Sequence, residues 1–164
     1  MESRPAQTLF SVKKKRGDRM DAAIYECPRE WEYLLPPGTR RVRRAGELEE
    51  HIWPLLALTP EGCRALTGGG EIVCRLLLAP GGPLPAQVRA ETVISYGLSP
   101  RDSLTLSSLT RPVLCVQRAL PRLDGNAVDA QEFPLPSLPG PAEALLPLLG
   151  LRLLQLPLTE DRFP

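Results

Sequence analysis

The sequence predicts a single α/β domain with a mixed sheet, in which a β-α-β unit is followed by antiparallel strands and a packed C-terminal helix. The β-α-β unit rests on two runs of strand length, Ile72–Leu78 and Thr92–Tyr96, which are apolar or β-branched and are bounded by proline or glycine. Between them, Leu84–Ala90 has room for one or two helical turns. We therefore expect the two strands to be parallel, with a right-handed crossover.

The antiparallel strands are predicted by turn residues followed by alternating apolar and polar residues. Ser99–Asp102 supplies a turn between Thr92–Tyr96 and the alternating run Ser103–Leu109, and Thr110–Pro112 supplies another before Val113–Leu120. In the last of these runs, successive side chains should face opposite sides of the sheet. The pattern of strand, turn and strand predicts antiparallel pairs in this region.

The C-terminal helix is predicted by Ala142–Leu149, which is apolar on nearly every side and therefore expected to be buried on the sheet. Pro141 suits the first helical turn, whereas Pro147 inside the run works against a regular helix. Gly150 is expected to cap the helix. Leu151–Leu156 is then either a further short strand or a continuation.

The segment Met1–Arg19 contains the basic cluster Lys13–Arg16 and shows no sustained periodicity, so we expect a disordered basic tail before a domain of residues 20–164. A second basic cluster, Arg40–Arg44, raises the alternative of a phosphate-contacting patch. Acidic residues follow it at once, and no aromatic residue lies within it. Nucleic acid is therefore not expected as a partner.

After the tail, Ala22–Tyr25 is the first segment expected to be ordered. Farther on, Ala45–Leu58 has the spacing of an amphipathic helix, although Pro54 would kink it. Its apolar face is formed by Leu48, Ile52, Leu55 and Leu56.

The next expected helix begins at Thr59, a capping residue, with Pro60 at its first position, and it runs through Leu66. Gly68–Gly70 then follow a helix and precede a strand. A phosphate loop has the opposite order and carries G-K-[ST], so these glycines are interpreted as a helix end and linker.

Toward the C-terminus, Leu123–Asn126 contains the hairpin signal Asp-Gly. We expect Val128–Leu135 to return as a strand that pairs with Val113–Leu120.

Length and composition limit the number of domains, the classes of partner and the length of the elements. A chain of 164 residues is long enough for one sizeable core, and a net charge of +1 does not indicate a surface built for nucleic acid or membrane. The chain has 19 prolines, which predicts short elements and stiff loops.

The cysteines do not have the spacing of a metal site. They are far apart, no C-x-x-C is present and His51 is the only histidine, so free, reduced thiols are expected. No apolar h-region opens the chain, and no apolar run approaches the ~18 to 20 residues of a membrane span. These features predict a cytoplasmic protein. The four cysteines are Cys27, Cys63, Cys74 and Cys115.

A strand ending in Tyr-Gly-Leu, then hairpin strands, then a Pro/Gly-rich turn and an apolar helix resemble the last third of the central domain of Mur ligases, the ATP-dependent amino-acid ligases of peptidoglycan synthesis. The matching segments, well under half of the chain, are Ile94–Ser99, Glu132–Leu138 and Gly140–Gly150. The chain also resembles short uncharacterised Firmicutes proteins, through Gln117-Arg118, Asp124-Gly125 and Gln131–Pro134.

The Mur ligase pattern is not complete in this chain. Mur ligases carry a G-T-x-G-K-[ST] phosphate loop, which is absent from this sequence. Leu78–Gly82 stands where they place an Asn-Ala-Asp-Asp-like segment. The resemblance therefore does not extend to ATP-dependent ligation, and no cofactor is expected.

No local motif for catalysis is present either. There is no G-x-S-x-G, and a Ser-His-Asp triad would have to use His51, which we interpret as a half-buried structural side chain. Asp102 is interpreted as a turn residue, and the hydroxyls of Ser103–Ser108 as the polar face of a strand. We therefore assign no catalytic residue and no metal ligand.

A ligand site is nevertheless expected at the sheet edge, because ligands of parallel sheets bind beyond the carboxyl ends of the strands. The loops Pro80–Pro83 and Gly97–Ser99 follow the two predicted parallel strands and should form a crevice. They offer backbone N–H groups and a hydroxyl but no lysine and no acidic pair, which favours a neutral or aromatic ligand over a triphosphate. The expected ligand-binding residues are Gly81, Gly82, Tyr96, Gly97 and Ser99.

The sequence thus predicts a non-catalytic binding or scaffolding role for a protein partner or a small molecule. The alternative is a protein that binds a small molecule or nucleotide at this crevice, including an enzyme whose active site has no local motif.

Overall fold

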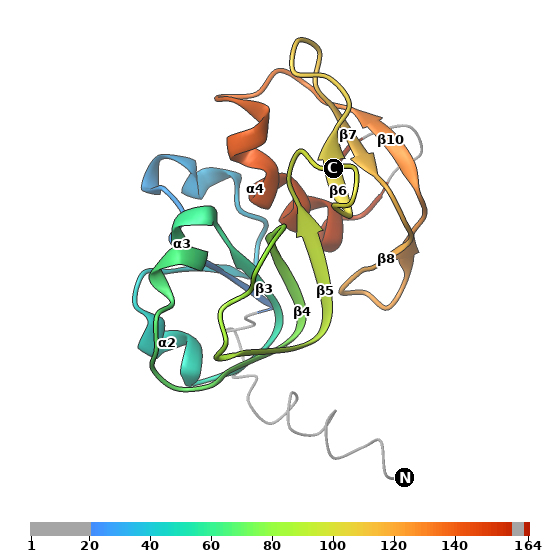
Figure 1. Cartoon of the computed structure of the whole chain (residues 1–164). Helices are drawn as coiled ribbons and strands as arrows, with labels where there is room; N and C mark the ends of the chain where they lie inside the picture. Colours follow the sequence, from blue (N-terminus) through green and yellow to red (C-terminus); the bar gives the residue numbers. More distant parts are fainter. Residues whose placement is uncertain (1–20, 159–162) are drawn as a thin grey trace, which may run out of the picture.

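The computed structural model describes residues 21–158 and 163–164, and the predicted tail at Met1–Arg19 lies outside them. The described chain forms an eight-stranded mixed sheet with the order β10-β7-β6-β5-β4-β3-β1-β2 (Figure 1). Parallel strands come first, antiparallel strands follow, and a C-terminal helix packs on the sheet. The predicted fold class is confirmed.

The parallel part of the sheet runs from β2 to β6. Strands β4 and β5 are parallel, as predicted, and their register places Leu76 beside Thr92 and Leu78 beside Ile94. Strand β6 is also parallel to β5, through Tyr96 and Leu104. The expected antiparallel pair between these two strands is therefore wrong. The bounds are β1 (Ala22–Tyr25), β2 (Thr39–Val42), β3 (Ile52–Leu58), β4 (Ile72–Pro80), β5 (Val88–Tyr96) and β6 (Leu104–Leu106).

The connection from β4 to β5 contains no helix, which corrects the prediction for Leu84–Ala90. Residues 81–87 must return along the length of a nine-residue strand. Seven residues span roughly 25 Å when extended but only about 10 Å as a helix. The connection is therefore an extended segment without a helix.

The helix predicted over Ala45–Leu58 is also wrong. Helix α2 (Ala45–Glu49) ends after five residues, and Ile52–Leu58 forms strand β3 in the interior of the sheet. Leu55 belongs to the hydrophobic cluster on one face of the sheet and Leu56 to the cluster on the other. A segment buried on both faces has an almost continuous apolar run, in which a helical spacing also occurs.

The two remaining predicted helices follow their local signals more closely. A short 3-10 helix, η1 (Arg29–Leu34), follows β1, and α3 (Pro60–Ala65) begins as predicted, with the Thr59 side chain accepting a hydrogen bond from the Gly62 N–H. Helix α4 (Ala142–Gln155) continues through Gly150, so the predicted cap is wrong and the alternative of a continuation is correct.

The antiparallel part consists of β7 (Val113–Val116), β10 (Gln131–Pro134) and a separate two-stranded hairpin, β8 (Leu120–Pro121) with β9 (Ala127–Val128). Strand β7 pairs antiparallel with both β6 and β10. The hairpin lies where the Asp-Gly signal predicted it. The long strands expected on either side of the hairpin are each divided in two.

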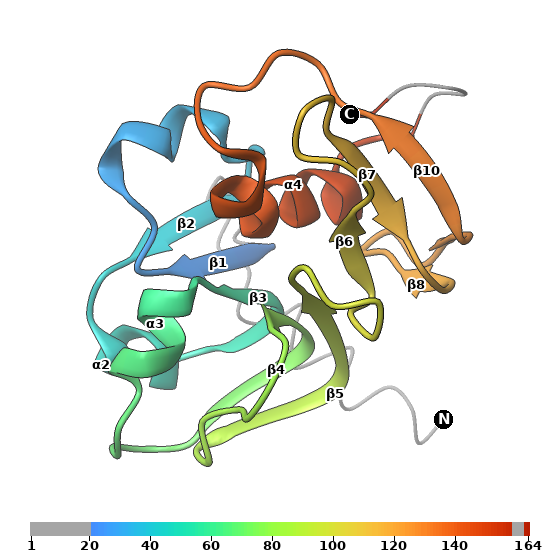
Figure 2. The same ribbon diagram turned by 45° about the horizontal axis from the view of Figure 1, so that its top comes forward.

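The two faces of the sheet are covered by different helices (Figure 2). Helix α4 packs on one face, and α2 and α3 pack on the other. The buried guanidinium of Arg122 fixes the end of α4, because its Nε donates to the Leu153 carbonyl at 3.1 Å and a terminal nitrogen donates to that of Leu156. None of the described helices has the length and apolar character needed to cross a membrane.

Candidate functional site

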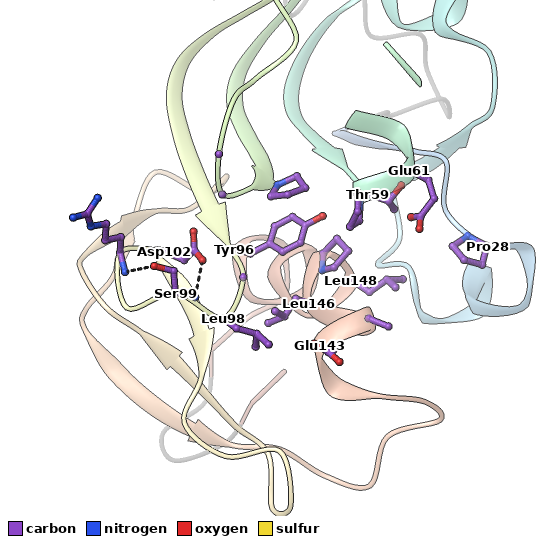
Figure 3. A pocket seen from close by; sticks show the side chains of 18 of the residues that line it. Pro28, Thr59, Glu61, Tyr96, Leu98, Ser99, Asp102, Glu143, Leu146 and Leu148 are labelled. Carbon is purple, nitrogen blue, oxygen red and sulfur yellow. Dashed lines mark hydrogen bonds between the residues drawn. The ribbon is translucent and has the colours of Figure 1, made fainter. Parts of the chain in front are cut away.

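A pocket of about 790 Å³ opens at the carboxyl ends of the parallel strands (Figure 3). The lining comes largely from residues at or just after the ends of four strands, β1, β3, β4 and β5. The first half of α4 completes the wall. The principal lining residues beyond the two predicted loops are Pro28, Trp31, Thr59, Glu61, Asp102, Glu143, Leu146 and Leu148.

Strand order explains why a pocket forms at this edge. The chain leaves β1 through η1, whose Trp31 packs with the cluster under α4, whereas it leaves β3 into α3 on the opposite face. Neighbouring strands whose connections diverge to opposite faces create a topological switch point, and ligands of open α/β sheets bind there.

The switch point is held together by Thr59, which is 3% exposed. Its hydroxyl lies 3.1 Å from the Tyr25 carbonyl and 3.0 Å from the Glu26 carbonyl, and it accepts the Gly62 N–H at 3.0 Å. Glu26 has a φ of 65°, the only positive value among the described non-glycine residues. Such strained positions often occur at functional sites.

All five residues predicted to bind a ligand line this one pocket: Gly81, Gly82, Tyr96, Gly97 and Ser99. The structure thus brings the two predicted loops together. Pro80 also lines the pocket. The prediction that they bind a ligand stays a prediction.

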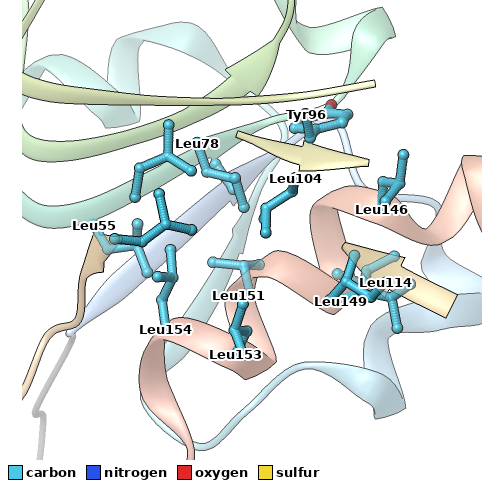
Figure 4. Packing of buried hydrophobic residues seen from close by; sticks show 14 of the residues in the cluster. Leu55, Leu78, Tyr96, Leu104, Leu114, Leu146, Leu149, Leu151, Leu153 and Leu154 are labelled. Atoms are coloured by element: carbon cyan, nitrogen blue, oxygen red, sulfur yellow. The ribbon is translucent and has the colours of Figure 1, made fainter. Parts of the chain in front are cut away.

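Tyr96 belongs to the core and also borders the pocket. It is 3% exposed, and its hydroxyl donates to the Leu58 carbonyl at 2.6 Å. Burial raises the pKa of this hydroxyl, and the nearby Cys63 and Glu61 raise it further, so the proton remains on the oxygen. Tyr96 and Leu146 connect the pocket floor to the leucine-rich core beneath α4 (Figure 4).

Asp102 is the main residue that the sequence interpretation missed. It is 5% exposed and lies between the two predicted loops. Its Oδ2 accepts the Ser99 N–H at 3.1 Å, and its own N–H donates to the Ser99 carbonyl at 3.0 Å. Asp102 is therefore a turn residue, as interpreted, but its carboxylate also forms part of the pocket wall.

Two glycines make room for this carboxylate. A Cβ atom at Gly81 would lie less than 3 Å from Oδ1, and one at Gly97 would lie 2.5 Å from Oδ2. Neither position therefore accepts a side chain while Asp102 stays in place. An acidic residue placed shortly after a strand end, with glycines in both neighbouring loops, was the available sequence signal.

Glu61 at the start of α3 and Glu143 at the start of α4 also line the pocket. Figure 3 shows them near Thr59 and Leu146, respectively, away from Asp102. The carboxylates come from three segments far apart in the sequence. The expectation that no acidic pair is present considered only the two loops and is incomplete for this reason.

The cysteines and the histidine, which could serve as nucleophiles, bases or metal ligands, do not form a catalytic group in the pocket. The four cysteines are free, as expected, and burial raises the pKa of each thiol, to about 11 for Cys27 and about 12 for Cys74. His51 is half buried against Trp53, with the ring centroids 5.1 Å apart, and is not among the pocket residues. Among the described residues, no group of three His, Cys, Asp or Glu side chains is arranged to hold a metal ion.

Comparison with protein-family models, with curated proteins and with solved structures finds no match to this chain. The resemblances to Mur ligases and to Firmicutes proteins therefore stay predictions.

Proposed function

We propose that this protein binds a small organic molecule, without converting it, in the pocket at the carboxyl ends of β1, β3, β4 and β5. The observation that carries the proposal is the pocket itself, which coincides with the switch point of the sheet. Its volume of about 790 Å³ falls in the range of small-molecule sites, roughly 300 to 1,000 Å³.

The lining also has the composition of a binding site. Apolar side chains and prolines form most of the wall, with a few polar groups at defined positions. The hydroxyl groups nearest the loops are already bonded: Tyr96 donates to a backbone carbonyl, and Ser99 Oγ accepts the Arg101 N–H at 3.2 Å. Neither hydroxyl is paired with a histidine or carboxylate base, which supports binding over nucleophilic catalysis. A scaffolding role for a protein partner stays a prediction.

The test is an NMR titration of the ¹⁵N-labelled protein with adenosine, uridine and a library of small aromatic fragments. Binding in the pocket is expected to shift the amide signals of Gly81, Gly82, Gly97 and Ser99 before those of other residues. Ligands that saturate the protein while leaving these signals unchanged would place the site elsewhere. The proposal would be overturned if no compound shifted them at millimolar concentration.

Ala144 allows a matched control. It is an exposed residue of α4 that lines the pocket, whereas Ala65 is an exposed residue of α3 that does not. Ala144→Phe should reduce binding by occupying the pocket mouth, and Ala65→Phe should leave it unchanged. Equal effects of both substitutions would argue against this location.

A further inference from the structure

We propose that the ligand carries a protonated amine on an apolar body, and that the amine pairs with Asp102. This inference rests on the proposed function, because it assigns the ligand class of the same pocket. The pocket wall contains a largely buried carboxylate, Asp102, whose hydrogen bonding is incomplete.

Asp102 is 5% exposed, and its Oδ2 accepts the Ser99 N–H. Oδ1 receives no hydrogen bond from the residues that the structure describes, and no cationic group among them forms an ion pair with it. No fully buried side-chain oxygen among the described residues lacks a hydrogen-bond partner, so Oδ1 keeps surface that a ligand in the pocket can reach. A largely buried carboxylate is stabilised by a cation that pairs with such an oxygen. The pocket wall thus contains one half of a charge pair.

The other charges around the pocket also favour a cation. Glu61 and Glu143 add two carboxylates, and Arg101 is the only basic residue among the described lining residues. Arg101 lies in the same turn as Asp102, yet its guanidinium is not within ion-pair distance of that carboxylate. A lining with this excess of negative charge attracts cations and repels phosphates.

The geometry favours an ammonium group over the other cations. A metal ion requires several converging ligands, and the described carboxylates do not form such a group. A guanidinium binds best to both oxygens of a carboxylate, but Oδ2 is bonded to the Ser99 N–H and lies against Gly97, which leaves it little room for a second donor. An ammonium group acts as a point charge and needs only Oδ1.

Apolar side chains form much of the rest of the pocket wall and select the body of the ligand. Leu98, Leu146, Pro147 and Leu148 line the pocket, together with Tyr96 and Trp31. An aromatic or aliphatic body would be desolvated there while its amine reached the carboxylate. The sequence-based expectation of an aromatic ligand is retained, and the expectation of a neutral one is replaced.

Three indole probes of similar size separate the effect of the ligand's charge from the effect of its apolar body. Tryptamine is a cation, tryptophol carries a hydroxyl in place of the amine, and indole-3-propionate is an anion. NMR titration should give tryptamine an affinity at least about tenfold higher than that of tryptophol, because it makes a charge-assisted hydrogen bond. Indole-3-propionate should bind most weakly.

Asp102→Asn tests the partner, because asparagine has the same size and retains an oxygen for the Ser99 N–H. It should remove the advantage of tryptamine while leaving tryptophol affinity unchanged. Asp129→Asn, at an exposed residue that does not line the pocket, is the control and should change neither affinity.

The outcomes distinguish this inference from the proposed function. If tryptophol shifts the pocket amides and tryptamine binds no more tightly, the pocket binds small molecules but the amine assignment is wrong. An unchanged preference for tryptamine in Asp102→Asn would also overturn the assignment. If none of the three probes shifts the pocket amides, the amine assignment is overturned, while the broader ligand titration still decides the proposed function. If Asp102→Asn fails to fold, the affinities of the three probes for the native protein still test whether the pocket prefers an amine.

Discussion

Replacing Gly81 with alanine is expected to destabilise the protein because the new methyl group would collide with the Asp102 carboxylate. The Cβ atom would lie less than 3 Å from Oδ1 and 3.2 Å from Cγ. The carboxylate cannot simply move away, since Gly97 closes the other side and the Ser99 N–H holds Oδ2. Overpacking of this kind costs about 1 to 3 kcal/mol.

A double-mutant cycle isolates the collision from other effects of the substitution. Asp102→Ala removes both carboxylate oxygens, so Gly81→Ala in that background should cost less than ~0.5 kcal/mol, and the coupling free energy should be roughly 1 to 2 kcal/mol. Free energies of unfolding are measured by urea titration monitored by circular dichroism. Gly46→Ala is the control, because a Cβ at Gly46 meets no atom within 4 Å.

An equal cost of Gly81→Ala with and without the Asp102 carboxylate would contradict the predicted collision. Such additivity would mean that the two groups do not contact each other. The close approach of the β4 and β5 loops around Asp102 would then be wrong, and the pocket wall with it.

Three further predictions concern the rest of the fold. Gly150→Ala should cost about 1 to 3 kcal/mol in urea titration, because its Cβ would lie 2.6 Å from a methyl of Leu78, whereas Gly46→Ala should cost nothing; equal costs would contradict the packing of α4. Arg122→Met should lower the free energy of unfolding by about 2 to 4 kcal/mol, because it removes a buried guanidinium that bonds carbonyls at the end of α4; a loss below ~0.5 kcal/mol would exclude this role. The Asn126 N–H that binds Asp124 lowers the pKa of that carboxyl, so its stabilisation is present at neutral pH and is lost as pH falls through the folded-state pKa. Asp124→Asn should therefore destabilise the protein more at pH 7 than at pH 2, and an equal effect at both values would contradict the assignment.

Several elements could be predicted from the sequence because their signals depend only on neighbouring residues. Thr59 and Pro60 supply a cap and a first helical residue whatever surrounds them, and α3 begins there. Asp124 and Gly125 supply the backbone conformation of a tight turn, and the β8–β9 hairpin forms around it. The strand-end crevice was predictable for a related reason, since the position of the loops follows once β4 and β5 are parallel.

The tertiary structure decided the features that depend on contacts between distant residues. Ile52–Leu58 is a strand because two hydrophobic clusters, built from segments on both sides of it in the chain, bury its two faces. Asp102, Glu61 and Glu143 meet around one pocket because the sheet and α4 bring three loops to the same edge. Apart from the position of Asp102 after a strand end, spacing along the chain does not show that the three carboxylates share one pocket. The sequence therefore predicts where the pocket opens, and only the packing of the elements determines its charge.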